Sequence, residues 1–300
     1  MKTVNQKDIF LGLFFSGIYF FLSLYWSQKV NIYGDTLEYY YAFLNVNNIT
    51  FPWHLEYFTS TLMFFLNHLG ADFRGFLFIN YLLWLPLVYY IFSKSRKDIF
   101  VFFIGLFFLS YIFFNNAAFL IRQFNAFLFF IYLLLAFNHG LRYLFLVLML
   151  TSHLSSLIFL IFYFEKISNV ILKYRKIIFL IFLLLLFFNV NFIVEFLINF
   201  SSDVAGFDRK LSSVSGYVNT GNDSKIFFVF LNFIIVAIIV FSNKFYPVKK
   251  MNRFFATILI SSMLYVVFRN EPILANRVAF VSYSFIIPGL FLVLRRLYVK

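Results

Sequence analysis

The sequence contains no cysteine, and only 12% of its 300 residues are charged. Without cysteine the protein has no disulfide bonds and no thiolate metal sites, and the redox compartment cannot be read from it. The four histidines show no ligand spacing and no Asp-x-Asp pair is present, so neither a metal nor another cofactor is predicted. Walker, Rossmann and zincin patterns are absent too, which argues against a nucleotide enzyme.

What the chain does contain is apolar: 63% of its residues are hydrophobic, and 51 are phenylalanine. A soluble domain cannot cover that much apolar surface with so few polar residues. The long runs are continuously apolar rather than alternating, which predicts helices and excludes strands. We therefore predict an all-α, polytopic transmembrane helical bundle. Its clearest runs approach or reach the roughly 20 residues that cross a bilayer: 9–26, 73–92, 99–114, 177–197 and 226–241.

About ten apolar peaks appear at a window of about 19 residues. Short basic loops at 94–97, 166–176 and 244–253, together with both termini, are predicted to lie in the cytoplasm. Most of the net charge of +13 lies in these loops, so it indicates how the chain is oriented in the membrane. No nucleic-acid partner is predicted. The number of peaks conflicts with this assignment in two intervals. Residues 54–93 contain two apolar peaks where an outward and a cytoplasmic segment should be joined by one, and 142–165 contains one peak where none or two are expected. Either the 94–97 cluster breaks the positive-inside tendency, or one or two short segments are re-entrant or lie along the interface.

The chain shows no solenoid repeat and no long linker, so residues 1–300 are predicted to form a single integral membrane domain. The longest hydrophilic stretch lies around 199–225 and is predicted to be extracytoplasmic. Loops of this length are usually functional or disordered, and the apolar residues within this one favour a function.

Arg122 lies inside an apolar stretch, where inserting an arginine into a membrane costs roughly 2.5 to 3.5 kcal/mol. A chain that keeps such a residue is expected to use it for binding or pairing. Its planar guanidinium matches phosphate oxygens, and the Asn125 amide one turn on shares its helical face, which favours anion binding. The alternative is snorkelling to the outer headgroups or a structural ion pair with one of three acids, Asp35, Glu56 or Glu195.

His153 lies between apolar flanks in the sequence Thr-Ser-His-Leu-Ser-Ser. Histidine can exchange a proton near neutral pH, so His153 is a candidate general base. Ser155 and Ser156 follow it and could orient the ring or bind hydroxyl groups. The alternative is a hydrogen-bonded strap between helices. Ser-His-Asp hydrolysis is not predicted, because no strand-borne nucleophile elbow is present.

Two acidic residues stand at the start of predicted helices. Asp35 with Glu38 resembles a capping box, but Asp35 also shares a helical face with Tyr39, so a cap and a site residue both remain possible. Glu56 stands where a new apolar run begins, either as a general base or as a charge at a helix N-terminus.

Several basic residues fall in segments predicted to face outward, against the usual bias of loops. A bound pyrophosphate would explain them. They are Arg209, Lys210, Arg269 and Arg277.

Taken in chain order, these residues form a recognisable series. Its members are Gly34-Asp35 with Tyr39 and Tyr40, Glu56, Ile121-Arg122-Gln123, His153-Leu-Ser-Ser-Leu-Ile158, Lys210-Leu211 with Tyr217, and Arg277. The series resembles the EpsG branch of the Wzy-type polymerases of O-antigen, capsule and exopolysaccharide repeat units, over nearly the whole chain. One departure is that this family often has Glu-Pro-Gly-Phe where the present chain has Glu56-Tyr57-Phe58.

The resemblance implies a polysaccharide polymerase, a glycosyltransferase of the bacterial inner membrane. It would join undecaprenyl-pyrophosphate-linked oligosaccharide repeat units on the periplasmic face by an inverting, metal-independent transfer. Donor and acceptor are then both lipid-linked repeats, and a flippase and a chain-length regulator are the expected partners.

The resemblance also implies roles for individual residues. Arg122 and Arg277 would bear the charge of the departing pyrophosphate. His153 would deprotonate the attacking hydroxyl, with Asp35 or Glu56 as its rival or orienting partner. The remaining predicted contacts with substrate are Gln123, Tyr39, Tyr217, Arg209 and Lys210.

Two other functions would use the same charged outer site. One is a flippase for lipid-linked oligosaccharides or another transporter, although the paired halves common in transporters are not seen in the sequence. The other is a ligase or acyltransferase, which would differ only in its acceptor.

Overall fold

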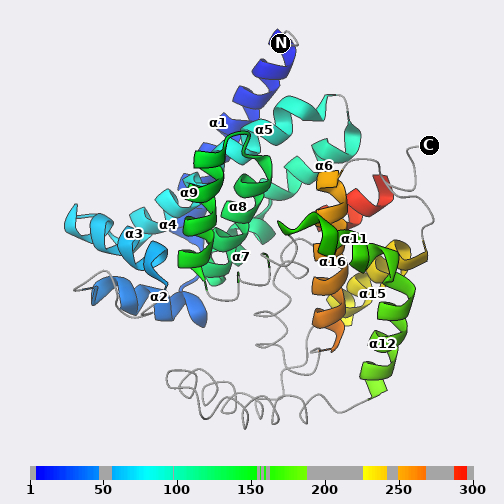
Figure 1. Cartoon of the computed structure of the whole chain (residues 1–300). Helices are drawn as coiled ribbons and strands as arrows, with labels where there is room; N and C mark the ends of the chain where they lie inside the picture. The colour runs from blue at the N-terminus through cyan, green and yellow to red at the C-terminus, as the bar shows by residue number, and fades with distance from the viewer. Residues whose placement is uncertain are drawn as a thin grey trace. The chain divides into compact units, whose positions relative to one another are not determined.

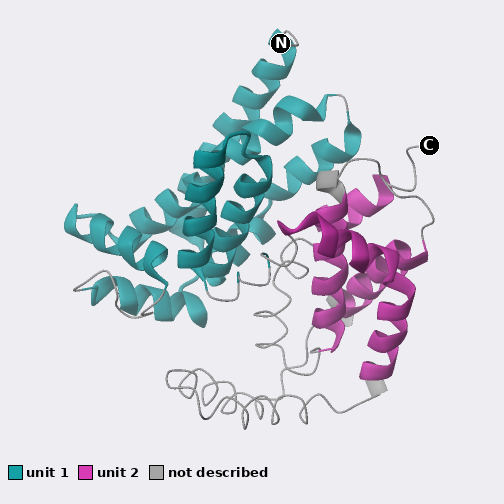
Figure 2. Cartoon of the chain, in the orientation of Figure 1, with its two compact units in different colours: residues 1–159 teal, residues 160–300 magenta. Residues whose placement is uncertain are grey.

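The computed structural model describes residues 5–46, 56–96, 98–153, 156, 159, 163–187, 226–241, 249–267 and 287–295. Within these ranges the regular elements are helices and no strand occurs (Figure 1), which confirms the predicted all-α class. The chain divides into two compact units, unit 1 at 1–159 and unit 2 at 160–300 (Figure 2). The prediction of a single domain over 1–300 stays a prediction.

The described helices are distributed over both units. Unit 1 contains α1 (Gln6–Lys29), α2 (Asp35–Leu44), α3 (Tyr57–His68), α4 (Phe73–Leu82), α5 (Leu85–Ser95), α6 (Ile99–Phe108), α7 (Tyr111–Phe119), α8 (Ile121–Leu135) and α9 (His139–Ser152). Unit 2 contains α11 (Glu165–Lys173), α12 (Arg175–Phe187), α15 (Ile226–Phe241), α16 (Lys249–Val267) and a further helical segment at 287–295.

Helix α1 runs antiparallel to the α4–α5 pair in unit 1. The register is fixed by three contacts: the Asp8–Arg96 ion pair at 3.7 Å, the Tyr19 hydroxyl donating to the Tyr81 carbonyl at 2.9 Å, and the Arg74 guanidinium donating to the Ser27 carbonyl at 3.0 Å. The start of α1 therefore lies at the same end of unit 1 as the basic cluster of Lys94 and Arg96. The end of α1, with the beginning of α4, lies at the opposite end.

Two described stretches are long and apolar enough to cross a membrane, α1 with 24 residues and 73–95 with 23. Helices α6 and α7 make a third if they count as one span, although they are bent by 54° at their break. The prediction of about ten spans is therefore not confirmed.

Helices α2 and α3 are too short to cross a bilayer. With 10 and 12 residues they rise about 15 and 18 Å, against a hydrocarbon core of about 30 Å. This favours the alternative in which a short segment between α1 and the 94–97 cluster does not cross the membrane. The predicted loop at 199–225 and the second half of the run 177–197 lie outside the described residues.

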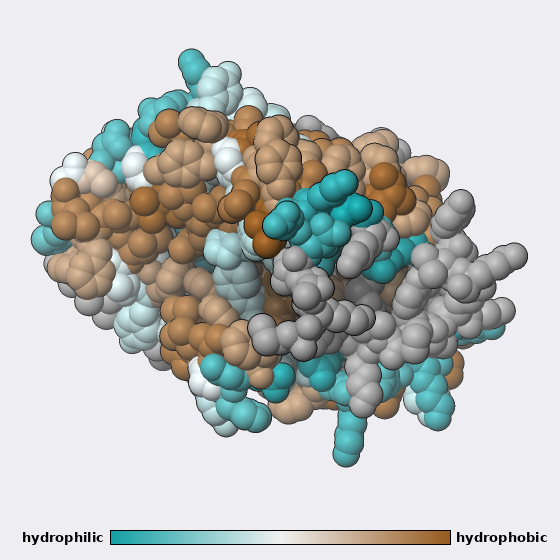
Figure 3. Space-filling view, turned by 90° about the horizontal axis from the view of Figure 1, so that it is seen from above, coloured by the Kyte–Doolittle hydropathy of each residue, from teal (hydrophilic) through white to brown (hydrophobic). Residues whose placement is uncertain are grey.

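Helix α8 forms the core of unit 1: twelve of its 15 residues are buried, and it packs along α9. Trp84, Phe113 and Phe124 meet as an aromatic cluster beside it. Other phenylalanines, such as Phe10 and Phe21 on α1, are exposed, and brown apolar side chains cover much of the described surface in Figure 3. Apolar residues thus serve both the core and a lipid-facing surface, as a membrane protein requires.

The start of α2 does not fit the capping-box alternative for Asp35. The N-cap is Gly34, with φ +54°, and no side chain caps this end; Asp35 lies in the first helical turn. A Cβ at Gly34 would meet the Phe119 ring at 2.8 Å. The turn therefore needs glycine both for its positive φ and for the close approach of α7.

Candidate functional site

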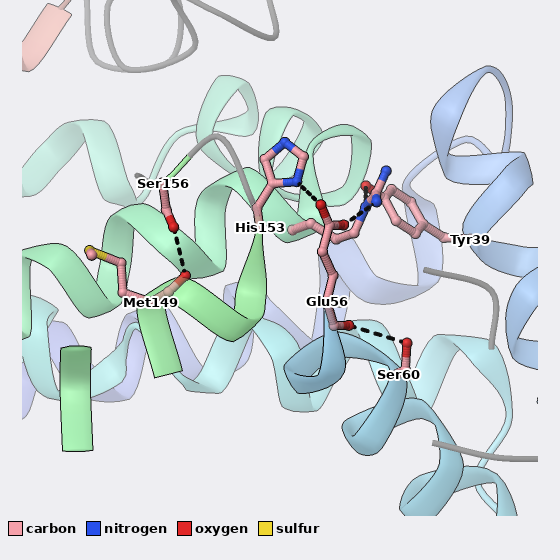
Figure 4. A network of polar contacts seen from close by, with 7 residues as sticks. Tyr39, Glu56, Ser60, Met149, His153 and Ser156 are labelled. Atoms are coloured by element: carbon pink, nitrogen blue, oxygen red, sulfur yellow. Dashed lines mark hydrogen bonds and ion pairs between the residues drawn. The ribbon is translucent and has the colours of Figure 1, made fainter. Parts of the chain in front are cut away.

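Glu56 lies at the N-terminus of α3 and directs its side chain away from that helix. It is the N-cap residue, yet its side chain makes no capping hydrogen bond. Only 1% of the side chain is exposed, and the carboxylate contacts both Arg122 and His153. Figure 4 shows the Glu56 side chain directed at His153. The charge of Glu56 is thus used for contacts with α8 and with the end of α9.

Arg122 enters the site from the first turn of α8. Its Nη1 forms an ion pair with Glu56 Oε2, and its Nε donates to the Tyr39 hydroxyl oxygen at 3.1 Å. The guanidinium also lies over the Tyr39 ring, 5.6 Å from the ring centroid. With 12% of the side chain exposed, Arg122 is held by a carboxylate and an aromatic ring in a largely dry setting.

His153 reaches the same carboxylate from another element. Helix α9 ends at Ser152, and His153 follows it in an extended conformation, with φ −162° and ψ 133°. Its Nδ1 lies 2.7 Å from Glu56 Oε1. An ionised carboxylate can only accept, so Nδ1 carries the hydrogen, and in the neutral ring Nε2 is then the proton acceptor.

Tyr39 is buried on α2, and its hydroxyl faces Arg122. Burial raises the pKa of this hydroxyl, and the nearby guanidinium lowers that pKa by less, so the phenol stays protonated. Sequence reasoning had assigned Tyr39 to sugar binding and missed its contact with Arg122. No local pattern reveals the contact, because the two residues lie 83 positions apart.

The other predicted site residues of unit 1 lie nearby but are held differently. Asp35 stands one turn before Tyr39 on α2. Gln123 is buried, and its Oε1 has no hydrogen-bond partner in the described structure. Ser156, a candidate to orient His153, instead donates to the Met149 carbonyl at 3.0 Å.

A second buried polar contact lies below the site and was not foreseen. The Asn125 Nδ2 donates to Asn80 Oδ1 at 2.8 Å, and both side chains are fully buried. The pair joins α8 to α4 within an otherwise apolar core. The available signal was a single amide in each of two apolar runs, which is the pattern of a polar strap between helices.

Four predicted substrate contacts lie outside the described residues, so the structure does not place them: Arg209, Lys210, Tyr217 and Arg277. Glu195, one of the acids considered as a partner for Arg122, lies outside them as well. Among the described residues, no group of three or more His, Asp or Glu side chains could hold a metal ion.

Residues 12–300 match the EpsG family. The chain belongs to the EpsG family. This confirms the family suggested by the series from Gly34 to Arg277, and it indicates a polysaccharide polymerase-like membrane protein. Comparisons with curated proteins and with solved structures found no match. In this EpsG-family chain, three residues of the series that are far apart in sequence, Glu56, Arg122 and His153, meet in unit 1.

Proposed function

We propose that the protein is a glycosyltransferase that joins lipid-linked oligosaccharide repeat units into a polysaccharide. The observation that carries the proposal is the convergence of Arg122, Glu56 and His153 in a family of polymerase-like membrane proteins. The three residues supply a cation, a carboxylate and an imidazole, which are the groups that a transfer from a pyrophosphate to a hydroxyl needs.

In the proposed reaction, a hydroxyl of the acceptor sugar attacks the anomeric carbon of the donor glycan. The new C–O bond forms as the bond to pyrophosphate breaks, so the configuration inverts. Nε2 of His153 takes the hydroxyl proton, and undecaprenyl pyrophosphate leaves with both electrons of the broken bond. No oxidant or reductant is required.

The geometry favours His153 over Glu56 as the base. Each Glu56 oxygen already accepts from a donor, Arg122 on one side and His153 on the other. A carboxylate stabilised in this way is a weaker proton acceptor, and it is well placed to orient the imidazole. Glu56 is therefore proposed as a positioning residue, and Asp35 stays a candidate for contact with substrate.

Arg122 is proposed to bear charge that develops on the departing pyrophosphate. Its guanidinium has five donors in a planar fork, so it can hold a carboxylate and a phosphate together. Arg277 is kept as the second proposed cation.

The architecture of unit 1 supports an extracytoplasmic site. The antiparallel register of α1 and α4–α5 brings Lys94 and Arg96 to the end where α1 begins. The site lies toward the other end, because α2 follows the end of α1 and Thr36 donates to the Ala118 carbonyl, just before α8. If the basic end lies in the cytoplasm, as the positive-inside tendency predicts, the site lies toward the periplasm.

The proposal is tested by replacing Arg122 in cells that make the polysaccharide. Arg122→Ala is expected to abolish long chains while single-repeat product and protein level persist, and Arg122→Lys should rescue poorly because the planar fork is lost. Arg142→Ala is the matched control, since this arginine lies on α9 and donates to the Ala136 carbonyl, away from the site. A normal chain-length ladder in the Arg122 variants would refute the assignment.

A charge exchange separates the catalytic role from a structural ion pair. The double variant Glu56→Arg with Arg122→Glu keeps opposite charges at the two positions. A purely structural pair predicts that both stability and polymer length recover in this variant. The proposed function predicts that stability recovers at least in part while polymer remains absent. The arginine is then attached at the N-terminus of α3 instead of on α8, so the cation is in the wrong place.

A further inference from the structure

Helix α11 lies at one end of unit 2, where three apolar helices start or stop. Arg175, the first residue of α12, donates from Nε to the Val240 carbonyl at the end of α15, and from Nη1 to the Leu172 carbonyl of α11, both at 2.9 Å. Arg253, in the first turns of α16, pairs with Glu165 at 3.7 Å. Helices α12, α15 and α16 therefore all extend away from the level of α11, which marks a membrane surface.

Around its axis, α11 presents three different faces. At about 100° per residue, Ser168 and Leu172 lie on one arc, and both are buried. A second arc carries exposed apolar side chains, and a third, opposite to the first two, carries exposed polar ones. The apolar arc is Ile167 and Val170, flanked by the cap residues Phe164 and Tyr174, and the polar arc is Lys166, Asn169 and Lys173. Lys176, in the first turn of α12, is exposed as well.

This arrangement is unlike that of a helix that crosses the bilayer. Nine residues rise only about 14 Å, about half of the hydrocarbon core. A spanning helix also has no use for a separate row of lysines, whereas a helix lying in the interface needs one face toward acyl chains and another toward water. The buried arc serves contact with the rest of unit 2, since α11 packs on α16.

The charge of α11 selects the kind of lipid. The polar arc carries two exposed lysines, a third exposed lysine follows in the first turn of α12, and the acid of α11, Glu165, is paired with Arg253. Lysine side chains beside an apolar stripe reach naturally to the phosphate level of a membrane, and each one near the surface favours anionic over zwitterionic headgroups.

We propose that α11 lies in the plane of the membrane surface and that anionic phospholipid headgroups bind to its Lys166 and Lys173 and to Lys176 in the first turn of α12. The apolar arc of α11 is inserted at the boundary between headgroups and acyl chains. The inference concerns unit 2 alone and does not depend on the proposed transferase reaction.

The position of the helix is tested with single cysteines, which the cysteine-free chain allows without any background change. Val170→Cys and Asn169→Cys are adjacent, exposed and on different arcs. With a nitroxide on each, in the full chain reconstituted in vesicles, oxygen from the lipid phase should reach position 170 preferentially, and a water-soluble nickel complex should reach position 169. Equal access at both positions overturns the proposal. So does a label at 170 that neither reagent reaches, because a protein partner would then cover this face.

The headgroup preference is tested by the lipid that stays bound. The protein is purified from nanodiscs containing equal phosphatidylglycerol and phosphatidylcholine, and retained lipid is measured by native mass spectrometry. Replacing Lys166, Lys173 and Lys176 by glutamine should lower the preference for phosphatidylglycerol about tenfold. The matched control makes the same change at the exposed residues Lys7, Lys29 and Lys94, which are not gathered on one helix, and should lower the preference much less. Equal loss in both triple variants, or no loss in either, contradicts the proposal.

Discussion

Replacing Glu56 by glutamine should destabilise the protein strongly, although the two side chains have nearly the same shape. A carboxylate accepts from Arg122 through one oxygen and from His153 through the other. An amide has one accepting oxygen, so its NH₂ group must face Arg122, which can only donate, or His153, whose ring hydrogen would then have to move from Nδ1 to Nε2. The substitution also leaves the Arg122 charge without its carboxylate in a site where only 12% of its side chain is exposed.

The magnitude follows from burial. Removing one partner of a buried ion pair costs about 3 to 5 kcal/mol, and we expect Glu56→Gln to fall near the lower bound because one hydrogen bond survives. Thermal unfolding in detergent, followed by tryptophan fluorescence, measures the loss. Glu165→Gln is the control: its side chain is 31% exposed and pairs with Arg253 at 3.7 Å, so it should cost about 1 kcal/mol or less.

A double-mutant cycle completes the test. The variant Glu56→Gln with Arg122→Met removes both charges, so it should lose less stability than the sum of the two single variants. Additive losses, or a Glu56→Gln variant as stable as the wild type, would refute the idea that Glu56 and Arg122 stabilise one another.

Further predictions concern the architecture of unit 1. In the cysteine-free chain, a membrane-impermeant maleimide should label Lys94→Cys and Tyr33→Cys from opposite sides of the membrane. The two positions lie at opposite ends of the antiparallel arrangement of α1 with α4 and α5. Labelling of both positions from one side would contradict that register. Gly105→Ala should cost about 1 to 3 kcal/mol, because its Cβ would come within 2.6 Å of the Phe92 ring. Gly17→Ala, where nothing lies within 4 Å, should be nearly neutral in the same unfolding measurement, and equal effects would contradict the packing described.

The sequence predicted helix type and the extent of the strongest apolar runs. Helix α15 spans 226–241 as expected, and α1 covers the run 9–26 with a few residues added at each end. Hydropathy did not predict where runs break: 73–92 is divided at Leu83 and Trp84, and 99–114 is bent near Ser110. These breaks depend on turns and packing, because the residues on both sides are equally apolar.

For the candidate site, residue chemistry indicated individual candidates better than it indicated which of them contact one another. An arginine and a histidine in apolar surroundings stood out because burial of either is costly, so Arg122 and His153 were candidates from the sequence alone. Three acids were open as the partner of Arg122, and the pairing with Glu56 depends on how α3 meets α8. The cap and the site residue were both open for Asp35, and the capping-box spacing does not hold because the N-cap of α2 is Gly34, one residue earlier.

The most direct test of the central claim is elongation of lipid-linked repeat units by the purified protein without any ion gradient. His153→Asn is the decisive variant, because the asparagine amide can replace Nδ1–H as donor to Glu56 but offers no group in place of Nε2 to take a proton. The account predicts that the wild-type protein lengthens the repeats, and that His153→Asn folds with similar stability but produces no elongation. A wild-type protein that transports the repeats without lengthening them, or a normal ladder from His153→Asn, would contradict it.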